Sequence, residues 1–424
     1  MKEYMEMSNI EIRKLNCGVR VVMEIIPHVQ SAAIGIWTKT GAVNEEAKYA
    51  GVSHYIEHMM FKGTETRSAR EIAADIDKIG GQMNAFTGKE ATCYYVKVLK
   101  DNFEKGAEVL LDMLNNSLFD KTEMDKERQV ICEEIKMIED QPDDLAHDTV
   151  SEILFKGNPL GNSIIGTPTS LNRISRNVLT GYFEKQYTRD SIVVSVAGNI
   201  DPDKVCAYLE DKFEKLQASK PAHENGYTPY EKKHKVIVKD IQQSHLCLAT
   251  RAISLIDPKY YSYSVLNNVM GGSMSSRLFQ NIREEKGLAY SVYSMLSCFS
   301  SDGYFNIYAG VSHDKIHAAI GGIREELEIL ASQGITEEEL SASREQLKSN
   351  YIFGQENVAS RMFAIGKNLT LLDRVFTPEE VLAGLDAVTM DDIEEVKKAL
   401  CDINSYSAAA VTNKRINLKR MMEG

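Results

Sequence analysis

Residues 174–199 read ISRNVLTGYFEKQYTRDSIVVSVAGN, and residues 388–413 read VTMDDIEEVKKALCDINSYSAAAVTN. Both stretches begin at helical spacing, pass through a short polar break, and end in small and β-branched residues that close on Asn. They align without a gap. Nearer the start of each half, residues 30–46 line up with residues 243–259 at almost the same spacing. A repeat at a fixed spacing indicates one architecture used twice, so the sequence predicts two homologous domains.

The joint between the two copies is predicted at residues 218–231, ASKPAHENGYTPYE, because this stretch is rich in Pro, Gly, Ser and Asn. We therefore expect a first domain at 1–217 and a second at 232–424. The predicted fold class is α+β, with each domain a mostly antiparallel sheet packed with helices.

The first half sets the expected order of elements. Alternating strands are predicted at residues 19–26 and 32–37, where β-branched and apolar residues follow turn signals. An amphipathic helix comes next, then one strand across residues 84–99, then long helices and a closing strand. Runs of strands beside packed helices favour this fold over a doubly wound parallel sheet.

Composition narrows the classes of partner and the compartment. The chain has 424 residues and a formal net charge of −12, which argues against nucleic acid or an anionic membrane as partner. Its seven cysteines form no Cys-x-x-Cys pair, so neither a disulfide framework nor a structural zinc site is expected. The first residues lack a signal-peptide core, and no apolar run is long enough to span a membrane. A cytoplasmic location is therefore expected.

The stretch GVSHYIEHMMFKG, at residues 51–63, places two histidines four positions apart. On a helix such residues share a face, so His54 and His58 can direct their rings at one point, with Glu57 beside them. The pattern is the inverted form of a zinc-protease motif, although two histidines can also occur on a surface helix by chance. In the second copy the matching positions hold Asn267, Met270 and Gly271, so only one copy carries these polar side chains.

An open zinc site needs a third protein ligand, commonly a carboxylate. The best source is the predicted helix at residues 122–144, capped by Thr122, in which Glu127 and Glu134 lie on the same side as several apolar residues. Carboxylates on an inward stripe are costly unless they are paired or bound to metal. The alternatives are that both face solvent, or that Glu133 is the ligand.

Several stretches together resemble the pitrilysin family of zinc peptidases, in particular the β-subunits of mitochondrial processing peptidase and their single-chain bacterial relatives. They are GVSHYIEHMMFKGT, GGQMNAFTGKEATCYY, ERQVICEEI, PLGNSIIGT and SRLFQNIREEKGLAYSVYS, and they span most of both halves. The resemblance implies one Zn²⁺ per chain, held by His54, His58 and Glu134. It implies that Glu57 is the general base. Glu127 would hydrogen-bond a ligand histidine and fix its tautomer.

The resemblance also points to Arg283 and Tyr290, in REEKGLAY, as groups that stabilise the tetrahedral oxyanion. In the family these residues reach the site from the opposite half of a chamber. For a chain with two domains, this implies that they act in trans across a homodimer, with the second domain completing the substrate chamber. Without the resemblance, Tyr290 would be expected to pack in the core of the second domain.

Asn84 and Ala85 match the substrate-contacting positions of the family. An extended peptide could pair with their strand, main chain to main chain, which favours unfolded polypeptides as substrates. The alternative is an interior strand that is already fully paired.

The sequence thus predicts a zinc-dependent endopeptidase that cuts extended peptides. The competing hypothesis is a subunit of the same family that binds peptides without catalysis, or that needs a different partner subunit. Such non-catalytic subunits typically lose part of the ligand set, which this chain retains.

Overall fold

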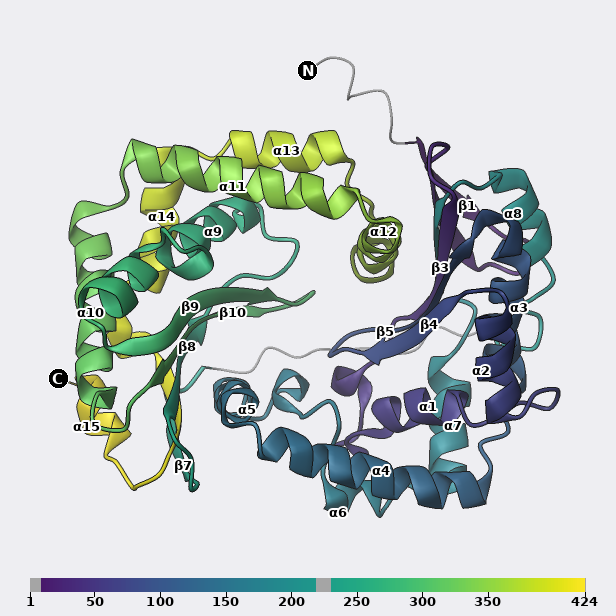
Figure 1. Cartoon of the computed structure of the whole chain (residues 1–424), viewed down its shortest axis with the longest axis horizontal. Helices are drawn as coiled ribbons and strands as arrows, with labels where there is room; N and C mark the ends of the chain where they lie inside the picture. Colours follow the sequence, from purple (N-terminus) through teal and green to yellow (C-terminus); the bar gives the residue numbers. More distant parts are fainter. Residues whose placement is uncertain (1–8, 219–229, 424) are drawn as a thin grey trace. The chain divides into compact units, whose positions relative to one another are not determined.

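The computed structural model describes residues 9–218 and 230–423 and groups them in two compact units, each built on one sheet (Figure 1). The predicted linker at 218–231 lies outside the described residues except at its ends. The first unit takes its described residues from Met1–Ile135, Asn162–Glu224 and Ile352–Glu380, and the second takes the rest. Each unit therefore draws on both halves of the chain.

The two sheets follow the same plan. The first has six strands in the order β1-β2-β6-β3-β5-β4, and the second has five in the order β7-β11-β8-β10-β9. The strands of the first sheet are β1 (Asn9–Lys14), β2 (Arg20–Ile25), β3 (Ser31–Thr38), β4 (Gln82–Thr87), β5 (Thr92–Leu99) and β6 (Ile192–Gly198). Those of the second are β7 (His234–Val238), β8 (Ser244–Arg251), β9 (Ala289–Cys298), β10 (Gly303–Val311) and β11 (Ser407–Thr412).

The pattern of parallel and antiparallel strand pairs is the same in both sheets, as the sequence repeat predicts. In each sheet the only parallel pair among the described strands joins the first strand of the repeat to its last, β2 to β6 and β7 to β11, and the other pairs are antiparallel. The two stretches that reveal the repeat form α7 (Arg176–Gln186) with β6, and α14 (Met390–Leu400) with β11. The prediction of two homologous, mostly antiparallel sheets packed with helices is confirmed.

The remaining helices follow the chain between the strands. In the first half they are α1 (Val52–Met60), α2 (Ala69–Lys78), α3 (Phe103–Asn116), α4 (Lys121–Glu139), α5 (Pro142–Leu154), α6 (Pro168–Leu171) and α8 (Pro202–Leu209). In the second half they are α9 (Tyr260–Asn267), α10 (Ile316–Gln333), α11 (Glu337–Gln355), α12 (Val358–Leu372), α13 (Pro378–Asp386) and α15 (Leu418–Glu423). No described helix combines the length and apolar character needed to cross a bilayer.

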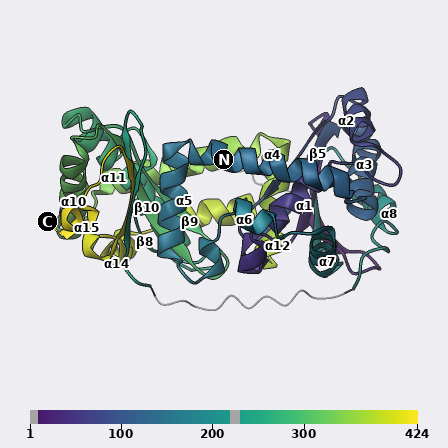
Figure 2. The same ribbon diagram turned by 90° about the horizontal axis from the view of Figure 1, so that it is seen from below.

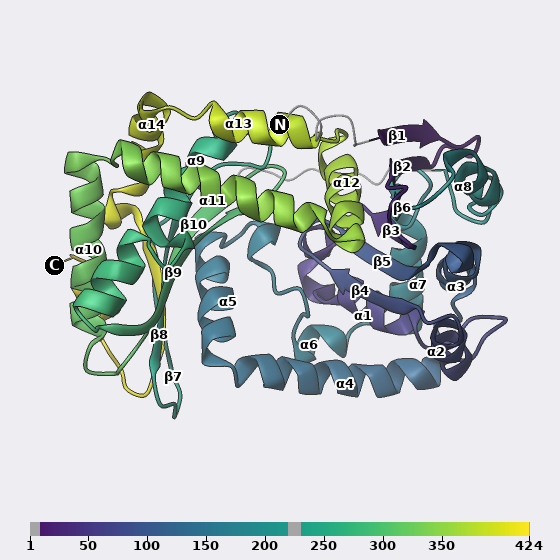
Figure 3. The ribbon, with the colours of Figure 1, turned by 45° about the horizontal axis from the view of Figure 1, so that its top comes forward.

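The first sheet buries both of its faces. Along β3, Ile34 and Ile36 point into the large core with α1 and α3, as alternation along a strand requires. Ala33, on the opposite face, packs with Val358 and Met362 of α12. Helix α12 comes from the second half of the chain but lies across β2, β3 and β6 (Figure 3).

The second sheet is covered in the reciprocal way. Its strands β8 and β10 place Leu246, Leu248 and Phe305 in the core of the second unit. On the other face α5, which comes from the first half of the chain, packs against β8 and β11 (Figure 2). Each sheet is thus covered on one face by a helix from the other half of the chain: the first sheet by α12 and the second by α5.

Two predicted elements differ from the structure. The single strand expected at 84–99 is a hairpin of β4 and β5, because residues 88–91 form a turn in which the Gly88 amide donates to the Ala91 carbonyl oxygen at 2.8 Å. The helix expected at 122–144 ends at Glu139, and Pro142 starts a new helix, since proline fits the first helical turn. Asp120, rather than Thr122, caps α4, because its carboxylate accepts the Thr122 amide at 2.8 Å.

Candidate metal centre

Helix α1 carries both histidines of the motif and is packed almost all round. Its buried residues include Ser53, His54, Tyr55 and Ile56. It begins at Gly51, whose φ of 92° is left-handed, where a side chain would also run into the carbonyl of Ile165. The helix is therefore fixed at its start and along its length, which restricts the positions of the two histidine rings.

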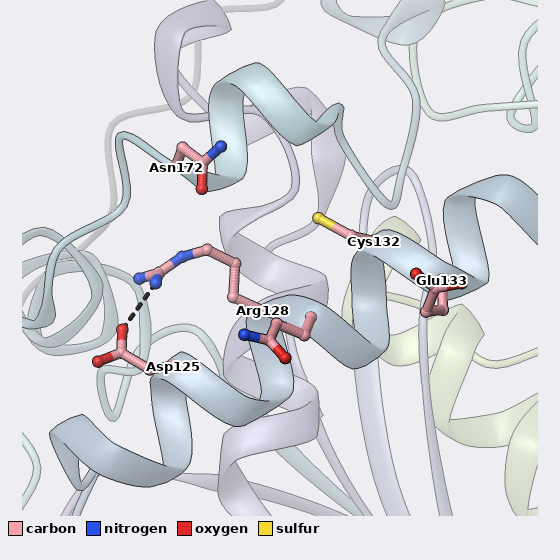
Figure 4. A pocket seen from close by; sticks show the side chains of 6 residues that line it. Asp125, Arg128, Cys132, Glu133 and Asn172 are labelled. Carbon is pink, nitrogen blue, oxygen red and sulfur yellow. Dashed lines mark hydrogen bonds and ion pairs between the residues drawn. The ribbon is translucent and has the colours of Figure 1, made fainter.

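Helix α4 brings the carboxylates. Glu127 is only 6% exposed, although no glutamate is expected to be buried without a partner. Glu134, two turns further on, is partly exposed and lies over the α1 histidines. Glu133, the rival ligand, is not a member of the cluster that His54 and His58 form, and it lines a pocket with Asp125 and Arg128 (Figure 4).

His54, His58 and Glu134 form the one cluster of potential metal ligands found in the described part of the chain. Glu134 Oε2 lies 3.8 Å from His54 Nε2 and 3.5 Å from His58 Nε2, and all three ligand atoms lie within 4.8 Å of one another. Zinc ligands at tetrahedral angles are about 3.3–3.5 Å apart, given metal–ligand bonds of about 2.0–2.2 Å. Two imidazole nitrogens and a carboxylate oxygen at these separations fit a zinc ion.

The His54 ring is held in the form that binds metal. Burial, aided by the neighbouring His58 ring, lowers the pKa of His54 to about 4. Its Nδ1 is buried and has no hydrogen-bond partner among the described residues, while its Nε2 lies 3.8 Å from Glu134 Oε2. A neutral ring at neutral pH leaves Nε2 free to act as a ligand.

The His58 ring is oriented by Glu127. His58 Nδ1 lies 3.1 Å from Glu127 Oε2, so the Nδ1 proton is donated to that carboxylate and Nε2 is left facing Glu134. Lys62, one turn beyond His58, forms a 2.7 Å ion pair with the other oxygen of Glu127. The buried carboxylate therefore has a partner on each oxygen.

Glu57 lies on the same helix and is mostly buried. The Thr87 hydroxyl, at the end of β4, donates a hydrogen bond to its carboxylate. Burial raises the pKa of Glu57, and the Thr87 hydrogen bond opposes that rise. A carboxylate with a raised pKa beside a metal site is suited to accept a proton from water.

Glu45 supports α1 from its N-terminal end. Its buried carboxylate accepts the amides of Gly51 at 2.7 Å and Ser53 at 2.8 Å, which are otherwise unpaired donors of the first helical turn. Burial raises the pKa of Glu45 to about 7.

Asn84 and Ala85 lie on β4, which is the outermost strand of its sheet and pairs only with β5. The strand is therefore not an interior one. Asn84 is exposed, and its side-chain oxygen accepts the Ala85 amide at 2.8 Å. A groove of about 630 Å³ runs along this strand. Its lining comes from α2, β4, β5, α12 and the residues that end α1 and precede α12, and it includes Phe61, Ile76, Met83, Asn84, Tyr95, Asn357 and Phe363.

Arg283 and Tyr290 belong to the second unit and are not members of the metal cluster. Arg283 lies on a short helical segment, Phe279–Glu285, and its guanidinium lies 5.8 Å from the centre of the Tyr290 ring. Tyr290 is 74% exposed on β9, so the expectation that it packs in a core is wrong.

Sequence reasoning found the cluster residues but missed three that support them: Glu45, Lys62 and Thr87. Lys62 follows His58 by four positions, a helical spacing that could have indicated it. Thr87 is the last residue of β4, where one unbroken strand was expected, so its place at a strand end was not predicted. Glu45 leaves no signal in the spacing, because it reaches α1 through a loop.

Comparison with known families gives two matches along the chain. Residues 20–168 match the family described as insulinase (peptidase family M16), and residues 173–347 match the peptidase M16 inactive domain. The second match begins inside the first copy of the repeat, just before residues 174–199, and runs across the predicted joint at 218–231. The metal cluster lies in the first match.

Relatives cover nearly the whole chain. The Bacillus subtilis protein YmxG, described as an uncharacterized zinc protease, is 42% identical over 92% of this chain and 95% of its own length. A Streptomyces coelicolor protein with the same description is 37% identical over 90% of this chain and 85% of its own. A crystal structure of a Helicobacter pylori protease superposes with a TM-score of 0.89 at 20% identity, covering 96% of this chain and all of that one.

Proposed function

The chain belongs to the insulinase family of peptidases, M16, and on that basis we propose that it is a zinc-dependent endopeptidase with one zinc ion per chain. The observation that carries the proposal is the convergence of His54 Nε2, His58 Nε2 and Glu134 Oε2 beside the carboxylate of Glu57. A zinc ion held there would lower the pKa of a water molecule and polarise the scissile carbonyl.

The protein's own groups would handle the protons. Glu57 accepts a proton from the attacking water and delivers it to the leaving amine. The Thr87 hydroxyl holds the Glu57 carboxylate in place, since it donates to one of its oxygens. Glu127 keeps the His58 tautomer that points Nε2 at Glu134.

Peptide substrates are proposed to bind as an added strand on the free edge of β4, with Asn84 and Ala85 among the pairing residues. Unpaired amides and carbonyls along an edge strand accept an extended chain with little regard to its side chains. The adjoining groove, of about 630 Å³, offers apolar surface from Phe61, Met83 and Phe363 together with polar groups. Unfolded polypeptides are therefore the proposed substrate class.

Arg283 and Tyr290 are proposed to stabilise the oxyanion of the tetrahedral species from the partner chain of a homodimer. Both are exposed, and a guanidinium beside a phenol hydroxyl supplies donors suited to a developing negative charge. The proposed location is cytoplasmic, which agrees with seven cysteines that are all free thiols.

The test is digestion of an unstructured peptide mixture with added zinc, read by mass spectrometry, with wild type compared to Glu57→Gln. Loss of the general base should reduce cleavage by about 10²–10⁴-fold. Cleavage by wild type alone supports the proposal, and the cut sites map its specificity. Equal cleavage by both proteins contradicts it. No cleavage by a zinc-loaded homodimer would favour the alternative, a peptide-binding subunit that is non-catalytic or needs a different partner. Size-exclusion chromatography with activity assayed in each fraction tests the homodimer.

A further inference from the structure

We propose that residues 165–174 act as a brace between α1 and α4, and that Arg128 is a positioning residue for the metal site because it anchors α4 to this brace. The inference rests on the proposed function, since it concerns the site at which zinc would bind. Two ligands stand on α1 and the third stands on α4, so the ligand geometry depends on how these two helices are held together.

Arg128 fastens α4 to one end of the brace. Its side chain lines a pocket with Cys132 and with Asn172 of the brace (Figure 4). Nε donates to the Leu171 carbonyl oxygen at 3.3 Å, and Nη2 donates to the Ile174 carbonyl oxygen at 3.2 Å. One planar guanidinium therefore grips two backbone carbonyls, which a lysine ammonium cannot do with the same geometry.

The other end of the brace is fastened to the start of α1. Ser170, which is 4% exposed, donates through Oγ to the Ala50 carbonyl oxygen at 2.7 Å. The backbones of Gly51 and Gly166 also lie so close that a Cβ on Gly51 would be 3.0 Å from the Gly166 Cα. The brace therefore meets the chain directly before the helix that carries His54.

Arg128 also lies against α1 itself. Its guanidinium is 5.9 Å from the centre of the Tyr55 ring, and the Tyr55 hydroxyl donates to the Met124 carbonyl oxygen on α4. Tyr55 is fully buried and directly follows His54. These contacts connect α1, which carries His54 and His58, directly to α4, which carries Glu134.

The ion pair of Arg128 with Asp125 is a weaker candidate for this role. The two side chains are 2.7 Å apart, but Asp125 is exposed and stands one turn away on the same helix. Such pairs contribute roughly 0.3–0.5 kcal/mol, and this one cannot connect α4 to anything else. The two carbonyl contacts are what tie the helix to the brace.

The test compares the zinc dissociation constant, measured by chelator competition, with the melting temperature of the zinc-free protein. Arg128→Lys keeps the charge but loses the two-carbonyl grip, and we expect it to raise the dissociation constant about 10–100-fold, as loss of groups behind metal ligands does. Asp125→Asn and the exposed Arg173→Lys are matched controls, and neither should change the constant more than about twofold.

Ser170→Ala tests the opposite end of the brace with a smaller change, and it keeps the inference testable if Arg128→Lys does not fold. It should raise the zinc dissociation constant in the same direction. A lower melting temperature with an unchanged dissociation constant in both variants would overturn the inference, because a merely structural role moves only the first. Failure of the wild type to bind zinc would overturn the proposed function and the brace with it.

Discussion

Arg361 on α12 and Glu24 on β2 lie 337 positions apart in the chain and form a buried ion pair within the first unit. Glu24 is 2% exposed, so the guanidinium is what makes its charge tolerable there. Arg361→Met should therefore lower the free energy of unfolding by about 3–5 kcal/mol, because it leaves an unpaired buried carboxylate. Urea denaturation measures this. The double variant Glu24→Met with Arg361→Met should recover most of the loss, and a single variant as stable as wild type would contradict the prediction.

The contact of α12 with the sheet depends on a glycine. A Cβ at Gly366 would overlap the Trp37 indole nitrogen and lie 2.6 Å from Ser195 Oγ, where these two side chains share a 2.9 Å hydrogen bond. Gly366→Ala should lower the free energy of unfolding by about 1–3 kcal/mol, because neither Trp37 nor Ser195 can move away without breaking the hydrogen bond between them. Gly354→Ala is the matched control, because a Cβ at Gly354 meets nothing within 4 Å. In thermal denaturation the control should be neutral, or more stable by about 0.5–1 kcal/mol.

The third ligand can be tested by the same exchange at two adjacent positions. Glu134→Gln should weaken zinc binding by more than the roughly 10–100-fold that losing a supporting carboxylate costs. Glu133→Gln should leave the affinity within about twofold, because its side chain lies outside the cluster. Isothermal titration with zinc distinguishes them. Equal losses in both variants would mean that the ligand assignment on α4 is wrong.

Stability should depend on pH through His147 of α5. Its ring is stacked with those of Tyr293 and Tyr308, and burial lowers its pKa from the ordinary 6.5, although Asp143 and Asp144 oppose the shift. Because the folded state binds this proton less readily than the unfolded state, the contribution of His147 is present above pH 6.5 and is lost as the pH falls through the lowered pKa.

His147→Phe keeps an aromatic ring in the stack and has no titrating group. Its free energy of unfolding should therefore fall less than that of wild type between about pH 8 and pH 5. Urea titrations at several pH values give the comparison. His28→Phe makes the same exchange at an exposed position and serves as the control. Identical pH profiles for wild type and His147→Phe would refute the assignment.

Much of the fold could be predicted because its determinants are local. The alternation at residues 19–26 and 32–37 predicts β2 and β3, and the repeated pattern predicts the second sheet. The exchange of α5 and α12 could not be predicted. Neither helix differs in composition from one that would cover its own sheet, and the contacts that place α12 join positions hundreds of residues apart.

Some residues of the candidate site could also be predicted from the sequence, and others could not. His54 and His58 are four positions apart on one helix, and the geometry of a helix places them together. Glu127 and Glu134 lie on a predicted inward stripe, where a carboxylate needs a partner, but the preference for Glu134 over Glu133 rests on the resemblance to the family. Thr87, Glu45 and Arg128 act through a strand end, a loop and two backbone carbonyls. Sequence periodicity holds no record of such contacts.

The exchanged helices also bear on how the gene itself could be divided. If the gene were divided between codons 217 and 232, it would give two polypeptides. The first would contain α5, which covers the second sheet, and the second would contain α12, which covers the first sheet. The products would have to be made together, and neither would be a free-standing domain. One polypeptide could therefore become two subunits at this point without the evolution of any new interface.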